Sequence, residues 1–296
     1  MSDVDFTDRI VVGTDLSHPA RGAVDWAAQR AARDGKVLLI VLVLPELPLP
    51  RKGHVFAAMR DGNYLAQLTE RAEKKLAGER DRVAMDHPSL VIETAVVEGI
   101  ASYVLARATK TATMVVIAAR GERVPVGVRA LGGTADAVAT HAHGPVAVVT
   151  GTEFHPDGPI VVGVDDSTAA RAAMEFASEE ASRTNKPLRV VHTWNIGPRE
   201  LHAAELGTYD LTTVTEAADR AVTEWLAPTI SKYPMLSIDR IVAHGSAGQA
   251  LVEQSKDASL VVVGSRGRGG FTALLLGSTS KEVLRQSHSP VVVLRG

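Results

Sequence analysis

The first half of the chain contains RIVVGTDLSHPARGAVDWAAQRAARDGKVLLIV, Arg9 to Val41, and the second half contains its counterpart PIVVGVDDSTAARAAMEFASEEASRTNKPLRVV, Pro159 to Val191. The two stretches align without a gap at an offset of 150, and 15 of the 32 positions from Ile10 to Val41 are identical. Average composition alone would give roughly two identities. The chain therefore contains an internal repeat.

The similarity resumes near the end of each half. MVVIAARG at Met114 to Gly121 matches LVVVGSRG at Leu260 to Gly267, and HAHGPVAVV at 141–149 matches QSHSPVVVL at 286–294. The seam between the halves, Gly151 to Pro159, is rich in the Gly, Pro and Asp residues that form turns and linkers. We therefore expect two domains, residues 1–150 and residues 159–296.

Each half alternates short apolar runs with helical segments. The runs at Ile10 to Val12 and Ile160 to Val164 are typical of strands buried on both faces. The periodicity predicts helices over 20–32, 65–85, 169–183 and 212–233. Strands separated by such helices imply right-handed crossovers and a parallel sheet. The expected fold class is α/β, with two tandem doubly wound, flavodoxin-like domains of the nucleotide-binding type.

Composition excludes several classes of function. The 296 residues carry a net charge of −2, which offers no field for nucleic acid or anionic membranes. The absence of cysteine excludes disulfides, thiolate nucleophiles and cysteine metal sites. The N-terminal residues are acidic, and the longest apolar run, Val37 to Leu44, is too short to span a membrane. We therefore expect a cytoplasmic protein with no nucleic-acid or membrane partner.

Ligands of doubly wound sheets bind beyond the carboxyl ends of the strands, where the strand order reverses. In the second half the first strand ends in Gly163-Val164-Asp165-Asp166-Ser167. A carboxylate at Asp165 can accept from a ribose hydroxyl or an adenine amine. The alternative is that Asp165 and Ser167 only cap the next helix. Asp165 and Asp166 are also compatible with Mg²⁺ beside a nucleotide, and the sequence does not decide this.

A glycine-rich loop follows the fourth strand of the second half. Its sequence is Gly264-Ser265-Arg266-Gly267-Arg268-Gly269-Gly270, and Gly277-Ser278-Thr279-Ser280 follows Gly267 after nine intervening residues. Glycines allow close approach of the backbone and positive φ, and successive N–H groups form an anion nest. The free N–H groups of a helix that begins near Gly277 suit a phosphate chain. The alternative is a flexible loop with a Ser cap.

These residues resemble a known family. The pattern G-x2-G-x9-G-S at Gly264, Gly267, Gly277 and Ser278, with Asp165 after the first strand, is similar to ATP-binding universal stress protein domains. The repeat makes the whole chain similar to a tandem universal stress protein. Neither GxxxxGK[ST] nor a GxGxxG after the first strand is present, which disfavours a P-loop NTPase and a standard NAD enzyme.

The resemblance implies that ATP lies across the strand ends, with or without Mg²⁺. Asp165 would hold the adenosine, the main chain at Thr193 would meet the adenine, and the glycine loop would cradle ribose and phosphates. The implied nucleotide-binding residues of the second half are Gly163, Val164, Asp165, Thr193, Val263, Gly264, Ser265, Arg266, Gly267, Arg268, Gly277, Ser278, Thr279 and Ser280. Those of the first half are Gly13, Asp15, Val43, Gly121, Gly132, Gly133 and Thr134.

The first half departs from the family pattern. Ala118 stands at the position of Gly264, Gly133 stands at that of Ser278, and ten residues separate Gly121 from Gly132. Asp15 is retained, so whether the first half binds ATP stays open. The resemblance also implies pairing through the last strands, which allows an internal pseudo-dimer of the halves or a homodimer.

We expect an ATP-binding stress-response protein whose occupancy acts as a regulatory switch with little or no hydrolysis. No catalytic residue and no metal site is assigned, because no activated base or nucleophile stands out beside the loop. His244 is the nearest imidazole that the sequence places at this edge. The alternatives are an enzyme that adenylates a substrate or hydrolyses ATP, and an interaction module without nucleotide.

Overall fold

The structure is a computed structural model that describes residues 4–45, 62–121, 131–150, 155–205, 210–267 and 275–296. It divides into two compact units, residues 1–152 and 153–296. The first unit contains β1 (Arg9–Thr14), α1 (His18–Asp34), β2 (Val37–Leu44), α2 (Gly62–Asp86), β3 (Ile92–Glu98), α3 (Ala101–Ala108), β4 (Met114–Ala118), α4 (Gly133–His141) and β5 (Val146–Val149). The second contains β6 (Ile160–Gly163), α5 (Thr168–Thr184), β7 (Leu188–Trp194), α6 (Pro198–Glu205), α7 (Leu211–Lys232), β8 (Ile238–His244), α8 (Ala247–Gln254), β9 (Leu260–Gly264), α9 (Ser278–Gln286) and β10 (Val291–Leu294).

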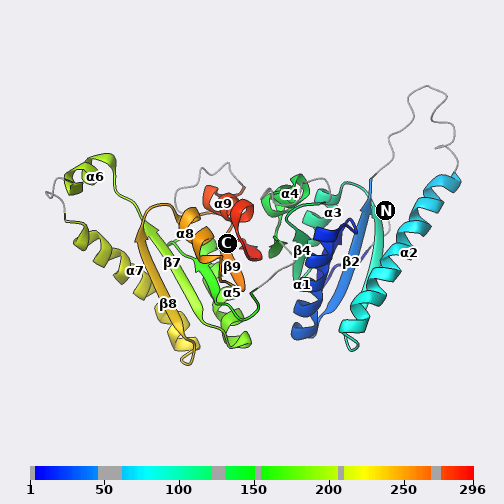
Figure 1. The fold of residues 1–296 in the computed structure, drawn as a ribbon, viewed down its shortest axis with the longest axis horizontal. Helices are drawn as coiled ribbons and strands as arrows, with labels where there is room; N and C mark the ends of the chain where they lie inside the picture. Colours follow the sequence, from blue (N-terminus) through cyan, green and yellow to red (C-terminus); the bar gives the residue numbers. More distant parts are fainter. Residues whose placement is uncertain (1–3, 46–61, 122–130, 151–154, 206–209, 268–274) are drawn as a thin grey trace, which may run out of the picture. The chain divides into compact units, whose positions relative to one another are not determined.

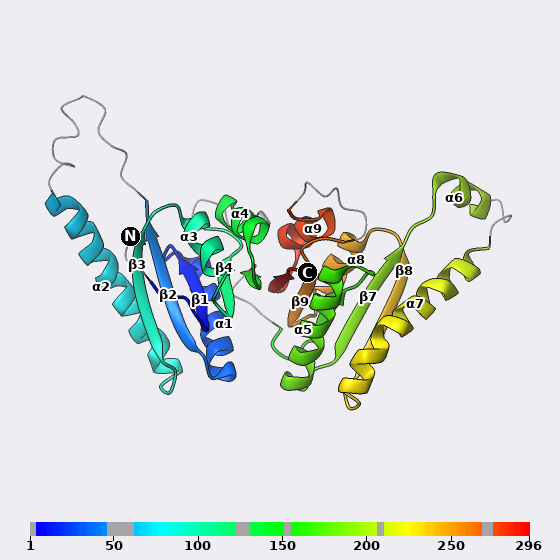
Figure 2. The same cartoon turned by 180° about the vertical axis from the view of Figure 1, so that it is seen from behind.

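The strands of each unit form a parallel sheet. The order is β3-β2-β1-β4-β5 in the first unit and β8-β7-β6-β9-β10 in the second. Helices cover both faces of each sheet: α5 and α7 lie on one face of the second sheet, and α8 and α9 lie on the other (Figures 1 and 2). The doubly wound α/β class expected from the sequence is confirmed.

The central strands build the core of each unit. Ile10, Val11 and Val12 of β1 are fully buried, and so are Val161 and Val162 of β6. Burial on both faces explains why these strands are continuous apolar runs rather than alternating ones. The resulting sheet is a rigid base from which the loops at its carboxyl edge project.

The helix that follows the first strand is fixed at both ends in the same way in each unit. Ser17 and Ser167 accept hydrogen bonds from the backbone N–H of the third residue after them, at 3.4 and 3.1 Å. Gly35 and Asn185 end the helices in the left-handed region, at φ 62° and 52°. These two residue types tolerate positive φ, so the same helix ends at the same place in both units.

The expected helices over 20–32, 65–85, 169–183 and 212–233 all form, and α6 is an additional short helix between β7 and α7. Within the described ranges, no helix has both the length and the apolarity needed to cross a membrane.

Candidate functional site

A cleft of about 770 Å³ lies at the carboxyl ends of β6, β7 and β9 in the second unit. β6 pairs with β7 on one side and with β9 on the other, so the strand order reverses here. Twelve of the expected residues line the cleft: Gly163, Val164, Asp165, Thr193, Val263, Gly264, Arg266, Gly267, Gly277, Ser278, Thr279 and Ser280. Ser265 lies behind it and is buried, with its N–H donating to Leu294 O at 2.7 Å. Arg268 lies outside the described residues.

The Asp165 carboxylate lies between the entry of α5 and the glycine loop. Its Oδ1 accepts from the N–H and the hydroxyl of Ser167, at 3.0 and 2.5 Å. Its Oδ2 faces Gly267, where a Cβ would come within 2.3 Å of it. Asp165 therefore supports the turn before α5, as the capping alternative expected, and it also borders the cleft.

Packing leaves little room for a side chain at three of the glycines. A Cβ on Gly264 would lie 2.7 Å from the backbone carbon of Ala169, at the start of α5. A Cβ on Gly163 would lie 2.7 Å from the Leu251 side chain, and one on Gly13 would lie 2.5 Å from Leu105. Helices thus approach the strand ends closely at these positions, whether or not a ligand is present.

The expectation of positive φ in the phosphate loop is wrong for Gly267 and Gly277. Gly277 has φ −71° as the N-cap of α9, and the described glycines with positive φ are Gly35, Gly99 and Gly245. Close approach explains glycine at Gly267, where a Cβ would meet the Asp165 carboxylate. The Gly277 N–H donates to Ser265 O at 2.7 Å, a bond that does not require glycine.

The N-terminus of α9 opens onto the cleft. The N-cap residue Gly277 has no side chain to cap this helix, and among the described residues the first N–H groups of α9 face the cleft, where an anion can accept from them. Ser278 is exposed and Thr279 is half-buried, whereas the Ser280 hydroxyl donates to Gly264 O at 2.6 Å. Ser280 therefore has a structural partner, and Ser278 and Thr279 are the hydroxyls that can reach a ligand.

Positive charge gathers beside the loop. Arg266 lines the cleft, and Arg266 and Arg295 both line a smaller hollow of about 220 Å³ at the start of α5. Burial, and then the charge of Arg266, lower the pKa of the Arg295 guanidinium from its usual value. Arginine stays protonated at neutral pH even so. Two guanidinium groups close enough to interact favour an anion in this smaller hollow, and Arg266 alone carries positive charge into the cleft.

The end of β7 supplies features that the sequence analysis missed. His192 and Trp194 line the cleft with Thr193. The His192 Nδ1–H donates to Val164 O at 2.9 Å, and the Trp194 ring lies 4.8 Å from the ring of His244. His244 is exposed and packs on Trp194, so His192 is the imidazole that borders the cleft. The only sequence signal was an aromatic residue at a strand end.

The first unit repeats the main-chain geometry of this site. Gly132 caps α4 with φ −69° and ψ 152°, and its N–H donates to Ala119 O at 2.7 Å. A Cβ on Gly121 would lie 2.8 Å from Asp15 Oδ2. Gly133 and Thr134 begin α4, and Val43 lies on β2. The side chains differ, since Gly133 cannot supply the hydroxyl of Ser278.

The loop after β1 also departs from its counterpart. Leu16 has φ 64°, a conformation that side chains rarely adopt, and its N–H donates to the Thr14 hydroxyl at 2.9 Å. Val164 stands at the position of Thr14 and cannot form this bond. Asp15 Oδ1 still accepts from Ser17 N–H at 3.0 Å, so the carboxylate keeps its place.

Comparison with known proteins identifies the family. The family model "Universal stress protein family" matches residues 7–150 and again residues 158–295. The chain belongs to the universal stress protein family. A universal stress protein of Mycobacterium tuberculosis is 31% identical over 306 residues, covering 97% of this chain and 94% of that protein. One from Mycolicibacterium smegmatis is 32% identical over 299 residues, covering 97% and 96%.

Solved structures give the same fold. A universal stress protein from Archaeoglobus fulgidus aligns with a TM-score of 0.68 and 18% identity, covering 97% of this chain and 98% of that one. Two universal stress protein units in tandem are therefore shown by both sequence and fold.

Proposed function

We propose that the second unit binds ATP in the cleft at the carboxyl edge of its sheet, and that occupancy of the cleft acts as a regulatory switch with little or no hydrolysis. One observation carries this proposal: the Asp165 carboxylate, the Gly267 loop and the N-terminus of α9 meet in a single cleft at the strand switch point. The cleft volume of about 770 Å³ lies within the ordinary range for small-molecule sites, roughly 300 to 1,000 Å³.

The two ends of the cleft differ in chemistry, as the two ends of a nucleotide do. The end at α9 offers helix N–H groups, the hydroxyls of Ser278 and Thr279, and the Arg266 guanidinium. These groups favour phosphates. The other end offers the Asp165 carboxylate and the residues at the end of β7, which suit a nucleoside.

The Trp194 side chain supports the nucleoside end. Its indole Nε1 is buried and has no hydrogen-bond partner among the described residues. A buried donor without a partner is unfavourable, so a ligand or water that accepts from it stabilises this region. The Trp194 ring also supplies an aromatic surface beside the main chain of Thr193, where the family resemblance implies adenine.

Mg²⁺ would reach this site with the phosphates of the nucleotide. The Asp166 carboxylate pairs with Arg171 at 2.7 Å, and the described residues contain no cluster of three or more His, Asp or Glu side chains placed to hold a metal. Binding should therefore be measured with and without Mg²⁺.

A hydrolysing or adenylating enzyme is the second candidate, and His192 is the observation that favours it. Because its Nδ1–H donates to a carbonyl, the neutral ring has its other nitrogen, Nε2, as an acceptor. A general base must reach hydrogen-bonding distance of the attacking group. The test is the rate of phosphate release from ATP in wild type, in His192→Gln and in the matched control His244→Gln. Release at about 1 s⁻¹ or faster that is lost in His192→Gln and kept in His244→Gln would favour the hydrolysing enzyme over the binding switch.

The first test is to purify the full chain, release any bound nucleotide by denaturation, and identify it by chromatography. Calorimetric titration of nucleotide-free protein with ATP, ADP and GTP then measures affinity and stoichiometry. We expect saturable ATP binding with at least one site per chain. Absence of ATP binding would refute the proposal and favour the nucleotide-free interaction module. Binding by the first unit, the internal pairing of the halves and a homodimer stay predictions.

A further inference from the structure

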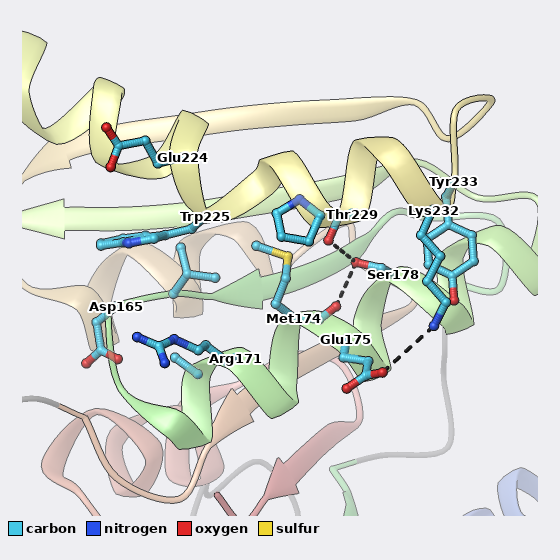
Figure 3. A pocket seen from close by; sticks show the side chains of 13 residues that line it. Asp165, Arg171, Met174, Glu175, Ser178, Glu224, Trp225, Thr229, Lys232 and Tyr233 are labelled. Atoms are coloured by element: carbon cyan, nitrogen blue, oxygen red, sulfur yellow. Dashed lines mark hydrogen bonds and ion pairs between the residues drawn. The ribbon is translucent and has the colours of Figure 1, made fainter.

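A second cavity of the second unit has no place in the proposed function. It is a groove of about 450 Å³ between α5 and α7, and Figure 3 shows its lining. Met174 and Arg171 approach from α5, and Trp225 and Pro228 from α7. The volume falls in the range of small-molecule sites. The groove adjoins the nucleotide cleft, because Val164, Asp165 and Ala170 line both.

Two buried hydroxyl groups lie in this mostly apolar groove. Ser178 is 1% exposed and Thr229 is 7% exposed, and their oxygens are 3.4 Å apart. The Ser178 hydroxyl donates to Met174 O at 2.7 Å. The Ser178 proton is therefore used, so Thr229 is the donor in the hydrogen bond between the two hydroxyls, and each oxygen keeps a lone pair that can accept from a ligand. A ligand that carries one N–H or O–H donor is complementary to these oxygens.

Two ion pairs and the exposed Glu224 carboxylate border the groove. Arg171 donates to Asp166 at 2.7 Å, and Lys232 lies 3.8 Å from Glu175. The hydrogen bond to Tyr233 is the largest of the effects that raise the pKa of Lys232, so this side chain stays charged at neutral pH. Paired charges give little attraction for an ion, so a neutral ligand suits the groove better than a charged one.

The Trp225 ring is the main aromatic wall of the groove. Its contact with His192 is edge-on, with the ring centroids 5.1 Å apart and the planes at 86°. In Figure 3 the Trp225 ring lies across the groove from Arg171. A flat aromatic molecule between them would contact the indole on one side and the guanidinium on the other, and both contacts are favourable.

The first unit has different residues at the corresponding positions. Its helix α2 aligns with α7 at an offset of 146, which places Glu79 at Trp225, Arg82 at Pro228 and Val83 at Thr229. Pro88 and Pro234, and then Leu90 and Leu236, follow at the same offset.

These first-unit residues form an ion-paired cluster. Arg82 Nη2 donates to Glu79 at 2.7 Å and to Asp25 at 2.6 Å, and Arg21 lies 4.0 Å from Glu79, which is 6% exposed. The second unit keeps the partners from the first helix, as Arg171 and Glu175, but has apolar residues in place of Glu79 and Arg82.

The replacement by Pro228 is unfavourable for the helix itself. A proline inside a helix removes a backbone hydrogen bond and costs about 3 kcal/mol. Its side chain contributes to the apolar wall of the groove. The second unit thus has a destabilising residue at the position where the first unit has a member of its ion-paired cluster.

We propose that the groove between α5 and α7 is a second ligand site, which binds a small neutral aromatic molecule carrying one hydrogen-bond donor. The Trp225 ring, Met174 and Pro228 contact the flat body of this ligand. The hydroxyl oxygens of Ser178 and Thr229 accept from its donor. Binding in this groove does not require that the neighbouring cleft binds ATP, so either site can fail without the other.

The test uses indole, which is neutral, planar and has one N–H donor, and 1-methylindole, which lacks the donor. Binding of both to the full chain is measured by saturation-transfer NMR and by titration. We expect saturable indole binding with a dissociation constant of about 1 mM or below. We expect binding of 1-methylindole to be about fivefold weaker, since one neutral hydrogen bond is lost.

Two variants locate the site. Thr229→Val carries the residue of the first unit and should weaken indole binding about fivefold. The double variant Trp225→Glu, Pro228→Arg rebuilds the ion-paired cluster of the first unit beside Arg171 and Glu175, and it should abolish binding. Met235→Ala, which removes an apolar side chain that is 94% exposed after the same helix, is the matched control and should bind as wild type.

Three results would overturn the proposal. The first is that the wild-type chain shows no saturable binding of indole, which would mean that the groove does not bind this class of ligand. The second is unchanged binding by the double variant with an intact thermal transition, which would place indole elsewhere. The third is equal binding of indole and 1-methylindole together with unchanged binding by Thr229→Val.

Discussion

Replacement of Gly267 by alanine should reduce ATP affinity without unfolding the second unit. The added Cβ would lie 2.3 Å from Asp165 Oδ2, far inside the van der Waals contact distance, so the carboxylate must move. Gly267 has no positive φ, so the backbone itself accepts alanine without strain. The perturbation therefore acts mainly on the position of one side chain.

The size of the effect follows from what Asp165 is proposed to do. A hydrogen bond between a carboxylate and a nucleoside hydroxyl or amine contributes about 1.5 to 3 kcal/mol, which is about a tenfold to hundredfold change in affinity. Oδ1 also accepts from Ser167, so a displaced Asp165 weakens the turn before α5 as well. We expect a small fall in melting temperature and a loss of at least tenfold in ATP affinity.

Isothermal titration of the full chain with ATP is the assay, and Gly121→Ala is the matched control. In the first unit the same Cβ would lie 2.8 Å from Asp15 Oδ2, so the steric change is similar but milder. Gly277→Ala is a second comparison, because its Cβ would meet Ser265 O at 3.4 Å and needs no rearrangement. Unchanged ATP affinity in folded Gly267→Ala would refute the role of Asp165. A larger loss in Gly121→Ala would reverse the ranking of the units.

Three further predictions concern single side chains. Asp165→Ala should lower ATP affinity about tenfold to a hundredfold and more than Asp15→Ala does, as measured by titration, because the second unit has the full glycine and serine pattern. Arg82→Met should lower the free energy of unfolding of the first unit by about 2 kcal/mol in denaturant titration, since it leaves Glu79 buried with only the more distant Arg21. Hydrogen bonds from Thr212 lower the pKa of the Asp210 carboxyl below 3.8, so the ionised N-cap stabilises α7 above that pH. This stabilisation is lost as the pH falls through the folded-state pKa of Asp210. Circular dichroism of Asp210→Asn should therefore show less helix than wild type at pH 7 and a smaller difference at pH 2.

The fold could be predicted because its signals are local and repeated. Buried parallel strands appear as apolar runs, and the serine caps of α1 and α5 mark helix starts. The repeat doubles each signal. Helix α6 could not be predicted in the same way, because it is only eight residues long and lies in the polar connection between β7 and α7, where the repeat gives no second copy of the signal.

The candidate site was predictable by location but not by the role of each residue. The switch-point rule placed Asp165 and the Gly267 loop at one edge, and the structure brings them together. The sequence did not reveal that Gly264 is required by packing against α5 or that Ser280 donates to a backbone carbonyl. These roles depend on contacts between distant segments, which no spacing along the chain records.

The groove lay beyond sequence reasoning for the same reason. Trp225 and Met174 are distant in the chain, and each alone is typical of a helix face that packs on a sheet. Only the three-dimensional comparison with Glu79 and Arg82 shows that one unit fills this space with charges while the other lines it with an aromatic ring.

The N-caps of α4 and α9 show what gene duplication has and has not altered in this polypeptide. The φ and ψ angles of Gly132 and Gly277 differ by only a few degrees, and each N–H donates over the same 2.7 Å. Amino-acid replacement has meanwhile separated Gly133 from Ser278 and Ala118 from Gly264. The two copies therefore share the path of the main chain at these caps while differing in the side chains that the path presents, so a change of ligand chemistry at this edge needs no change of backbone.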